Sequence, residues 1–367
     1  MERKKILHLI TGLEIGGAEM MLLKTLPRMQ AAFNNRVCCI MGHGPMSERL
    51  EKTGIPVYYL NLKNIFDLRV IIRFKKITKE FQPDILVTYL IHADIFGRIL
   101  GKIFGVKKII CSVRAKLIQP KYLPFLFLDA LTSPLVAHYH FNSQAVADMY
   151  YKFFFLPKRK ITVIPNGLEI EKYDIHIDTQ KKKEEFGIYQ NKTVLGYTAK
   201  LRKQKGHKYL ITAFAKVLRN NKDVVLILIG DGAERRNIEK QAQNLGISND
   251  LILLGNRDDI PEILQIIDIF VFPTLFEGMS NALMEAMAAG KPIIATDIPE
   301  NKELIEDGIS GILVPTKNPE AMCVAINDLI NKKEKNKILS ITAKNKVTSL
   351  YDIMVISKKY IDFIGKF

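Results

Sequence analysis

The chain has 367 residues, more than one ordinary domain, so we expect two domains that each bury a core. Hydrophobic residues make up 48% and charged residues 25%, which is typical of a globular protein. The net charge of +16 favours anionic partners, but the sequence has no nucleic-acid-binding motif and no apolar run long enough to span a membrane.

The cysteines and the N-terminal residues indicate a cytoplasmic protein. The apolar run 6–10 is too short for a signal peptide, and acidic residues soon follow it. The cysteines have neither C-x-x-C spacing nor neighbouring histidines, so we expect buried thiols in a reducing compartment. They are Cys38, Cys39, Cys111 and Cys323.

Short runs rich in Val, Ile and Leu alternate with amphipathic stretches, as parallel strands buried on both faces require. The strands expected in the first half are 6–11, 36–40, 57–60, 85–90, 108–113, 138–142 and 161–164. Those expected in the second half are 193–199, 224–230, 251–255, 269–273, 292–296 and 311–314. The sequence therefore predicts two successive βα arrays, divided between the turn 165–167 and the polar stretch 174–185.

The loop after the first strand is a candidate ligand loop, because ligands of open α/β sheets bind at the carboxyl ends of strands. Gly16 and Gly17 would let the backbone approach a ligand, and the helix expected at 20–29 would offer its N-terminus to a phosphate. The pattern is not G-x-G-x-x-G, so a tight β-to-α turn explains it equally well.

The second array opens with a basic loop. Lys200 and Lys205 follow its first strand and precede a helix expected at 209–219, so they could neutralise a diphosphate. The alternative is a solvated basic loop. The next two strands end at Gly230, within G-D-G, and just before Asn256 and Arg257, where backbone groups could bracket a nucleobase.

The segment 277–292 places two carboxylates beside an anion site. Ser280 can cap a helix at 281–289, and Gly290 suits its C-terminal end. The first turn would then aim backbone N–H groups at whatever lies beside Glu277, while Glu285, one turn inside, could reach ribose hydroxyls. The alternative is an ordinary helix with a good cap and two surface glutamates.

These motifs resemble the retaining glycosyltransferases of family 4, also called glycosyltransferase group 1, which have the GT-B fold. G-G-A-E at 16–19, V-I-P-N-G-L at 163–168, K-L-x-x-x-K-G at 200–206, G-D-G at 230–232 and E-x7-E at 277–285 follow the family order over essentially the whole chain. The resemblance implies α/β architecture with two Rossmann-like parallel-sheet domains facing a cleft. The acceptor-side domain would be 1–168, the nucleotide-sugar-binding domain 169–349, and a C-terminal helix at about 350–367 would pack back on the first domain.

The resemblance also implies roles for single residues. Lys200 and Lys205 fall on the basic pair that contacts the donor diphosphate, although the family usually has arginine at the first position, and lysine lacks its bidentate fork. Glu285 falls on the ribose-binding glutamate and Glu277 on the glutamate near the transferred sugar. The phosphates would face the amides of Met279, Ser280, Asn281 and Ala282.

One position departs from the family pattern. Relatives often have H-x-H after the fourth strand, where this chain has Val87-Thr-Tyr-Leu-Ile-His92. His92 could line the cleft as a catalytic residue, or it could face the core or solvent.

We therefore expect retaining transfer of a sugar from a nucleotide-sugar donor to a glycan or polyprenyl-linked acceptor during capsule or lipopolysaccharide biosynthesis, and the donor we expect is a UDP-sugar. No D-x-D pair occurs, so we expect neither metal nor cofactor. Two alternatives remain open, a non-catalytic binder of sugar nucleotides or polyanions and a dinucleotide-dependent enzyme. The sequence does not identify the donor sugar, the acceptor or the oligomeric state.

Three segments of the first half mix aromatic or aliphatic residues with cations, at 66–81, 123–128 and 150–160. Such mixtures suit the interface of an anionic bilayer, so we expect a peripheral protein on the cytoplasmic face of the membrane. In 66–81 the residues expected at this interface are Leu68, Ile71, Ile72 and Phe74. The alternative is that these helices cover the sheet with their apolar sides.

Overall fold

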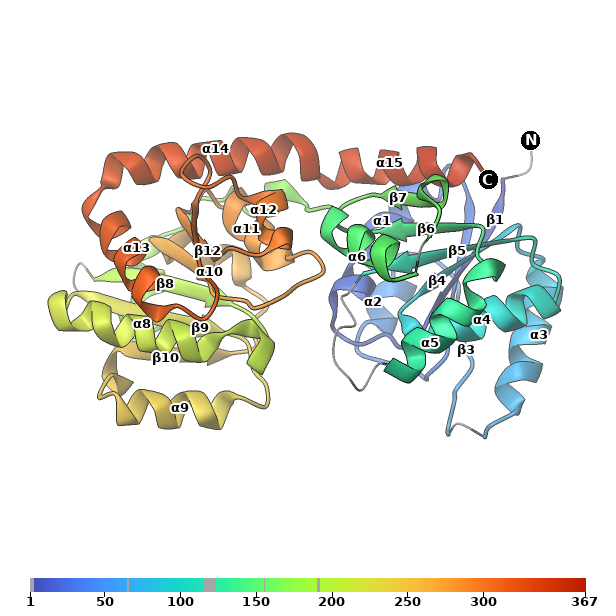
Figure 1. Cartoon of the computed structure of the whole chain (residues 1–367), viewed down its shortest axis with the longest axis horizontal. Coiled ribbons are helices and arrows are strands. Elements are labelled where there is room, and N and C mark those ends of the chain that lie inside the picture. The colour runs from blue at the N-terminus through green and yellow to red at the C-terminus, as the bar shows by residue number, and fades with distance from the viewer. Residues whose placement is uncertain (1–2, 65, 115–122, 155, 190–191) are drawn as a thin grey trace. The chain divides into compact units, whose positions relative to one another are not determined.

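The computed structural model describes residues 3–64, 66–114, 123–154, 156–189 and 192–367. The chain forms two compact units. Unit 1 comprises Met1–Gly167 together with Ile353–Phe367, and unit 2 comprises Leu168–Asp352. Figure 1 shows both units, with helices and strands labelled where there is room.

Unit 1 is built on a seven-stranded parallel sheet with the order β3-β2-β1-β4-β5-β6-β7. Its strands are β1 (Lys5–Ile10), β2 (Asn34–Cys39), β3 (Val57–Tyr59), β4 (Ile85–Tyr89), β5 (Lys108–Val113), β6 (His138–Phe141) and β7 (Ile161–Val163). Each lies within two residues of its predicted range. The order reverses between β1 and β4, as in the Rossmann fold.

The helices of unit 1 cover this sheet. They are α1 (Gly17–Met29), α2 (Ser47–Glu51), α3 (Arg69–Phe81), α4 (Ile91–Ile103), α5 (Leu123–Thr132), α6 (Gln144–Phe154) and α15 (Ile353–Gly365). α1 begins three residues earlier than predicted, so Gly17 is its first helical residue rather than part of the loop. All four cysteines of the chain are buried and unpaired, as expected.

The C-terminal helix α15 is part of unit 1 and packs against α1. Buried residues of α15 such as Ile353 and Phe363 join the cluster formed by α1 and one face of the sheet. A Cβ on Gly167 would lie 2.6 Å from Ile353 Cδ1, so only glycine allows this approach. Arg114 donates to Asn166 Oδ1 at 2.8 Å and to the Tyr360 hydroxyl at 2.7 Å. The residues 163–168 therefore help to fix α15.

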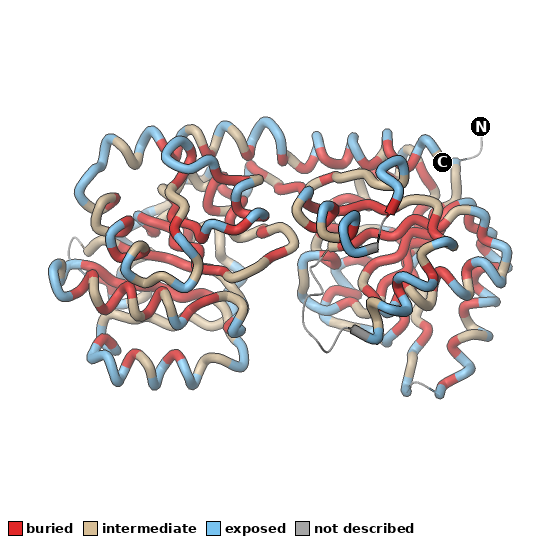
Figure 2. The backbone as a smooth tube through the Cα atoms, in the orientation of Figure 1, coloured by how far each residue is buried: buried red, intermediate tan, exposed pale blue. Residues whose placement is uncertain are grey.

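Unit 2 is built on a six-stranded parallel sheet with the order β10-β9-β8-β11-β12-β13. Its strands are β8 (Thr193–Thr198), β9 (Val224–Ile229), β10 (Leu251–Gly255), β11 (Ile269–Phe272), β12 (Ile293–Thr296) and β13 (Ile312–Val314). Each lies within one residue of its predicted range. The burial-coloured tube in Figure 2 shows the central strands of both sheets as buried, which explains their continuous apolar sequences.

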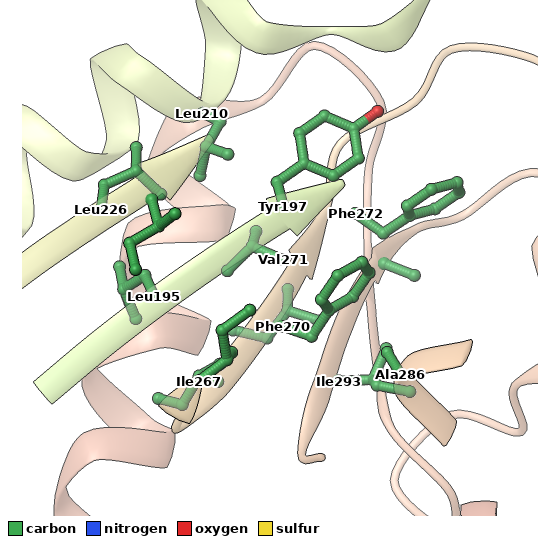
Figure 3. Packing of buried hydrophobic residues seen from close by; sticks show 14 of the residues in the cluster. Leu195, Tyr197, Leu210, Leu226, Ile267, Phe270, Val271, Phe272, Ala286 and Ile293 are labelled. Carbon is green, nitrogen blue, oxygen red and sulfur yellow. The ribbon is translucent and has the colours of Figure 1, made fainter. Parts of the chain in front are cut away.

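The helices of unit 2 lie on both faces of its sheet. They are α7 (Thr179–Glu184), α8 (His207–Asn220), α9 (Arg235–Asn244), α10 (Ile260–Ile266), α11 (Asn281–Ala288), α12 (Pro299–Leu304), α13 (Pro319–Asn331) and α14 (Lys333–Tyr351). Figure 3 shows the core between them, where Tyr197 of β8 lies beside Phe270 and Phe272 of β11. Gly196 leaves room for Ile267, whose Cδ1 would lie 2.1 Å from a Cβ. Among the described residues, no helix is long and apolar enough to cross a membrane.

Candidate functional site

The anion site predicted beside Glu277 is the start of α11. The Ser280 hydroxyl accepts the N–H of Leu283 at 3.2 Å, which makes Ser280 the N-cap. At the other end, Gly290 has φ 65° and donates its N–H to the Met287 carbonyl at 3.0 Å. The cap and the stop predicted from the sequence are therefore both present. They aim the positive end of the helix dipole at the carboxyl edge of the sheet.

Lys205 and Glu277, 72 positions apart in the chain, form an ion pair beside this helix start. The Glu277 side chain is 9% exposed and that of Lys205 is 19% exposed. Gly206 brings the lysine loop close to β11, because it has φ 71° and a Cβ there would lie 2.0 Å from the Pro273 carbonyl oxygen. The Tyr197 hydroxyl also donates to the Lys205 carbonyl at 3.0 Å. The close approach of Gly206 to β11 thus places the ammonium of Lys205 beside the carboxylate of Glu277.

A chain of hydrogen bonds through three buried side chains leads to Glu277. The sequence analysis did not identify any of the three. The Thr274 hydroxyl donates to Glu277 Oε1 at 3.1 Å. The Thr296 hydroxyl donates to the Thr274 carbonyl, and Asn301 Nδ2 donates to the Thr296 carbonyl at 2.8 Å. Thr274 and Thr296 are fully buried, and Asn301 is 1% exposed. The one sequence feature that could have indicated this contact is the position of Thr274, which follows β11 and lies three residues before Glu277.

Glu285 lies on α11 and is half-buried. Burial, and then the neighbouring Glu285 carboxylate that accepts its hydrogen bond, raise the pKa of the Tyr173 phenol. Gln265 Nε2 donates to the Tyr173 carbonyl at 3.0 Å, which fixes the backbone of that residue. Tyr173 therefore orients a carboxylate that the sequence analysis had considered alone. Met279 and Ala282, whose amides were expected at the phosphates, are partly buried against the core.

Close backbone packing explains why glycine occupies positions 230 and 232 of the G-D-G motif. Gly230 has φ 123°, and a Cβ on it would lie 2.2 Å from the Ala199 carbonyl oxygen. A Cβ on Gly232 would lie 2.5 Å from the Leu201 carbonyl oxygen. The Gly230 N–H donates to the Gly255 carbonyl at 2.7 Å, so this group is already hydrogen-bonded within unit 2. The two glycines instead support the loop that carries Lys200, which is exposed.

Arg257 and Asn256 follow β10 and are exposed. Arg257 binds Asp259 with two nitrogens, at 2.7 and 2.6 Å, and its guanidinium lies 5.6 Å from the Phe186 ring centroid. Lys182 also pairs with Asp259 at 2.7 Å. The hydrogen bond from Arg257 is the main cause that lowers the pKa of the Asp259 carboxyl. Arg257 is therefore engaged within unit 2 in this structure, whereas Asn256 remains a candidate contact.

In unit 1, Gly16 caps α1 with an extended backbone, φ −156°. A Cβ on Gly16 would lie 2.5 Å from Glu19 Oε2, so the missing side chain makes room for that carboxylate. Glu19 is buried in the first turn of α1, where a negative charge is stabilised by the helix dipole. This internal carboxylate accounts for Gly16 without a ligand phosphate.

His92 is the second residue of α4 and is exposed, with its ring 4.9 Å from that of Phe125. The preceding Leu90 has φ 72°, a rare conformation for leucine that costs of order 1–3 kcal/mol. The Ala93 N–H donates to Thr11 Oγ1 at 3.2 Å, which ties the start of α4 to the loop after β1. His92 thus shares the carboxyl edge of the unit 1 sheet with that loop. Apart from Gly16 and Gly17, the other candidates belong to unit 2.

Several buried groups of the chain have shifted pKa values. Asp94 accepts a hydrogen bond from Thr88 at 2.5 Å, and burial raises the pKa of its carboxyl to about 7 although Arg98 opposes the shift. The other titratable groups facing it include Asp129, which pairs with Arg98 at 2.5 Å, and the Cys111 thiol. Burial lowers the pKa of four histidines, to about 4 for His8, His138 and His207 and to about 3 for His140.

Two relatives by sequence illustrate what the chain resembles. It is 28% identical over 344 residues to an Escherichia coli UDP-Gal:alpha-D-GlcNAc-diphosphoundecaprenol alpha-1,3-galactosyltransferase, covering 88% of this chain and 87% of the relative. It is 29% identical over 191 residues to the N-acetyl-alpha-D-glucosaminyl L-malate synthase of Bacillus anthracis, covering 52% of this chain and 50% of the relative.

Solved structures share the fold of the whole chain. Anabaena HepE in complex with UDP and glucose has a TM-score of 0.90 at 23% identity, and the match covers 100% of both chains. A glycosyltransferase from Rickettsia africae has a TM-score of 0.86 at 20% identity, covering 100% of this chain and 99% of that chain. At these identities the likeness shows the fold, which is GT-B.

Two family models match consecutive parts of the chain. The model Glycosyltransferase Family 4 matches residues 15–172, and the model Glycosyl transferases group 1 matches residues 178–346. Together they include every candidate site residue and all the strands of the two sheets except β1. The chain therefore belongs to the glycosyltransferases of group 1 and family 4.

Proposed function

We propose that this glycosyltransferase moves a sugar from a UDP-sugar to an acceptor hydroxyl with retention of the anomeric configuration. The observation that carries the proposal is the Lys205–Glu277 ion pair beside the capped start of α11. A cation and helix N–H groups there can stabilise the charge that grows on a departing diphosphate, while the carboxylate faces the positive charge on the sugar ring. Related proteins support UDP, since the Escherichia coli relative is a UDP-Gal enzyme and HepE binds UDP.

The proposed site residues fall into two groups. One group contacts the UDP part of the donor, and the other contacts the transferred sugar. Lys205 and Lys200 hold the diphosphate together with the amides of residues 279–282, and Glu285, oriented by Tyr173, holds the ribose. Glu277 acts on the transferred sugar. The cations supply the counter-charge, so the proposal includes neither a metal nor a cofactor.

A thermal-shift screen of nucleotides and nucleotide sugars tests the donor. We expect UDP and UDP-sugars to raise the melting temperature most, because the Escherichia coli relative is a UDP-Gal enzyme and HepE binds UDP. ADP, GDP and NAD serve as matched controls. A larger shift with NAD would replace this proposal by a dinucleotide-dependent enzyme. UDP binding without any transfer would favour a non-catalytic binder of sugar nucleotides.

Retention has its own test. Proton NMR of the anomeric signal in an early product compares its configuration with that of the donor. An inverted linkage would remove the retaining mechanism and leave the glycosyltransferase assignment intact.

We further propose that the acceptor is lipid-linked and serves cell-surface polysaccharide synthesis at the cytoplasmic face of a membrane. The Escherichia coli relative acts on a diphosphoundecaprenol-linked sugar. In unit 1 several large apolar side chains are exposed on or next to α3, α5 and α6, and α3 and α6 also carry exposed lysines. The exposed apolar side chains include Phe66 (81%), Leu68 (70%), Ile72 (69%), Phe127 (70%) and Phe153 (74%).

The burial pattern also corrects part of the membrane prediction. Phe74, expected among the membrane-facing residues, is fully buried against the sheet, and so is most of Tyr150. Ile71 is half-buried. Phe155 lies outside the described residues, as do the side chains of Leu123 and Phe154. The helices thus cover the sheet with one side, and the proposal rests on the apolar residues of their other side.

Vesicle co-sedimentation tests this surface. We expect binding that requires anionic lipid and fades with salt, because exposed charges are screened over roughly 10 Å at 0.1 M. Leu68→Ser/Ile72→Ser should weaken binding, whereas Val324→Ser/Ile338→Ser, at similarly exposed positions of unit 2, should not. Equal binding to neutral vesicles, or none to anionic ones at low salt, would favour a water-soluble acceptor.

A further inference from the structure

A basic hollow lies at the amino edge of the unit 1 sheet, opposite the edge that carries His92 and the loop after β1. Its volume is about 1060 Å³, and it is lined by the residues before β1, the turns before β4 and β5, and the C-terminal ends of α3 and α4. Strands of five or six residues separate the two edges, which corresponds to roughly 17–20 Å. The hollow is therefore distinct from the candidate site.

Cations dominate the lining. Its cationic residues are Arg3, Lys4, Lys5, Lys75, Lys79 and Lys107. Among the described residues that line it, the only acidic side chain is Asp84, which accepts the Lys5 backbone N–H at 2.8 Å. Two of the cations also bind carbonyls, Arg3 that of Gln30 and Lys4 that of Gly365, each at 2.7 Å.

Lys75, Lys79 and Lys107 are exposed and form no ion pair with any residue in the described ranges. Lys76, next to them on α3, pairs instead with Glu80 at 3.8 Å. Lys75 and Lys79 are four positions apart on one face of α3, where like charges destabilise a helix. The clustering therefore costs stability unless an anion neutralises it.

The negative ends of the nearby helix dipoles do not balance the positive charge of these side chains. The C-terminal ends of α3 and α4 both line the hollow, and each helix end contributes about half a negative charge. The carboxylate of Asp84 adds one more negative charge. Positive charge still remains in excess in this concave volume, which favours a ligand with several negative charges.

We propose that this hollow binds a free oligophosphate, a compact anion with two or more phosphate groups. Lysines that reach a cavity from separate segments suit phosphate oxygens, because each ammonium acts as a point charge with three donors. The cavity is larger than one phosphate requires. Phosphate could also come from lipid headgroups, but a planar bilayer contacts protruding residues, whereas these cations line a concavity.

Titration calorimetry with sodium tripolyphosphate tests the proposal on the full chain. We expect saturable binding that weakens with salt and falls at least tenfold in Lys75→Gln/Lys79→Gln/Lys107→Gln. The matched control is Lys52→Gln/Lys63→Gln/Lys358→Gln, which removes equal charge from exposed positions outside the hollow and should bind normally. Far-UV circular dichroism should be the same in all three proteins, which verifies that unit 1, where all six substitutions lie, is folded.

Three results would overturn the proposal. Tripolyphosphate could fail to bind the wild-type protein at low salt. The two triple variants could lose affinity equally, which would show a general effect of net charge. In a parallel arm with phosphatidylglycerol vesicles, the Lys75/Lys79/Lys107 variant could lose vesicle binding while tripolyphosphate binding stays unchanged, which would assign these lysines to a lipid headgroup surface.

Discussion

Removing the charge of Lys205 should destabilise unit 2, because it leaves the carboxylate of Glu277 without its cation. Breaking a buried ion pair from one side costs about 3–5 kcal/mol. Thr274 still donates to Glu277, and the 19% exposure of Lys205 shows that water reaches the pair, so we expect about 2 kcal/mol for Lys205→Met. A domain of this size loses roughly 2–4 °C in melting temperature per kcal/mol, which predicts a fall of roughly 4–8 °C.

The double variant isolates the interaction. Glu277→Gln alone should cost about 1 kcal/mol, because the ammonium of Lys205 can turn towards water. Lys205→Met/Glu277→Gln has no unpaired charge and keeps an oxygen for the Thr274 hydroxyl, so it should be more stable than Lys205→Met alone. Urea unfolding without nucleotide measures all four proteins. Purely additive losses would refute the ion pair as a stabilising contact.

UDP affinity in the same variants tests the role of the pair. Lys205→Met should weaken binding by about ten- to a hundredfold, the equivalent of one charge-assisted hydrogen bond. Glu277→Gln should leave binding equal or tighter, because the carboxylate no longer competes with the diphosphate for Lys205, and it should impair turnover. Calorimetry decides, and a loss of affinity in Glu277→Gln as large as in Lys205→Met would contradict the proposed division of roles.

Other predictions concern the supporting residues and pH. Thr274→Val should lower kcat with little change in UDP affinity, and Thr274→Ser should restore it; equal activity of both variants would remove Thr274 as a positioning residue. Tyr173→Phe should weaken UDP binding severalfold by calorimetry, since Glu285 loses a donor; unchanged affinity would argue against that support. The histidines with lowered pKa values stay neutral in the folded state, so stability should be full above pH 6.5 and fall as pH drops towards 4. Asp94 acts oppositely between about pH 4 and 7, because its raised pKa lets the folded state hold a proton, and Asp94→Asn should therefore steepen the acid loss in urea unfolding. A shallower loss would contradict the raised pKa.

The sequence alone determined the two sheets and the helix start at the site. Strands such as β9 are continuous apolar runs, because parallel strands need hydrophobic residues on both faces, and that pattern is local. The start of α11 was equally readable, since Ser280 acts on an N–H only three residues away and Gly290 adopts its own left-handed conformation. Such features depend on a few neighbouring residues.

Only the tertiary structure decided what the candidate residues contact. The Lys205–Glu277 pair joins positions 72 apart, and it forms because Gly206 meets a carbonyl at the end of β11. The same limit applies to two of the candidate glycines. Gly16 makes room for Glu19, and Gly230 for a neighbouring loop, although both resemble ligand-binding glycines in the sequence. A glycine in such a loop indicates that another group approaches the backbone closely. Only the folded structure shows whether that group is a ligand, a side chain or the backbone of another loop.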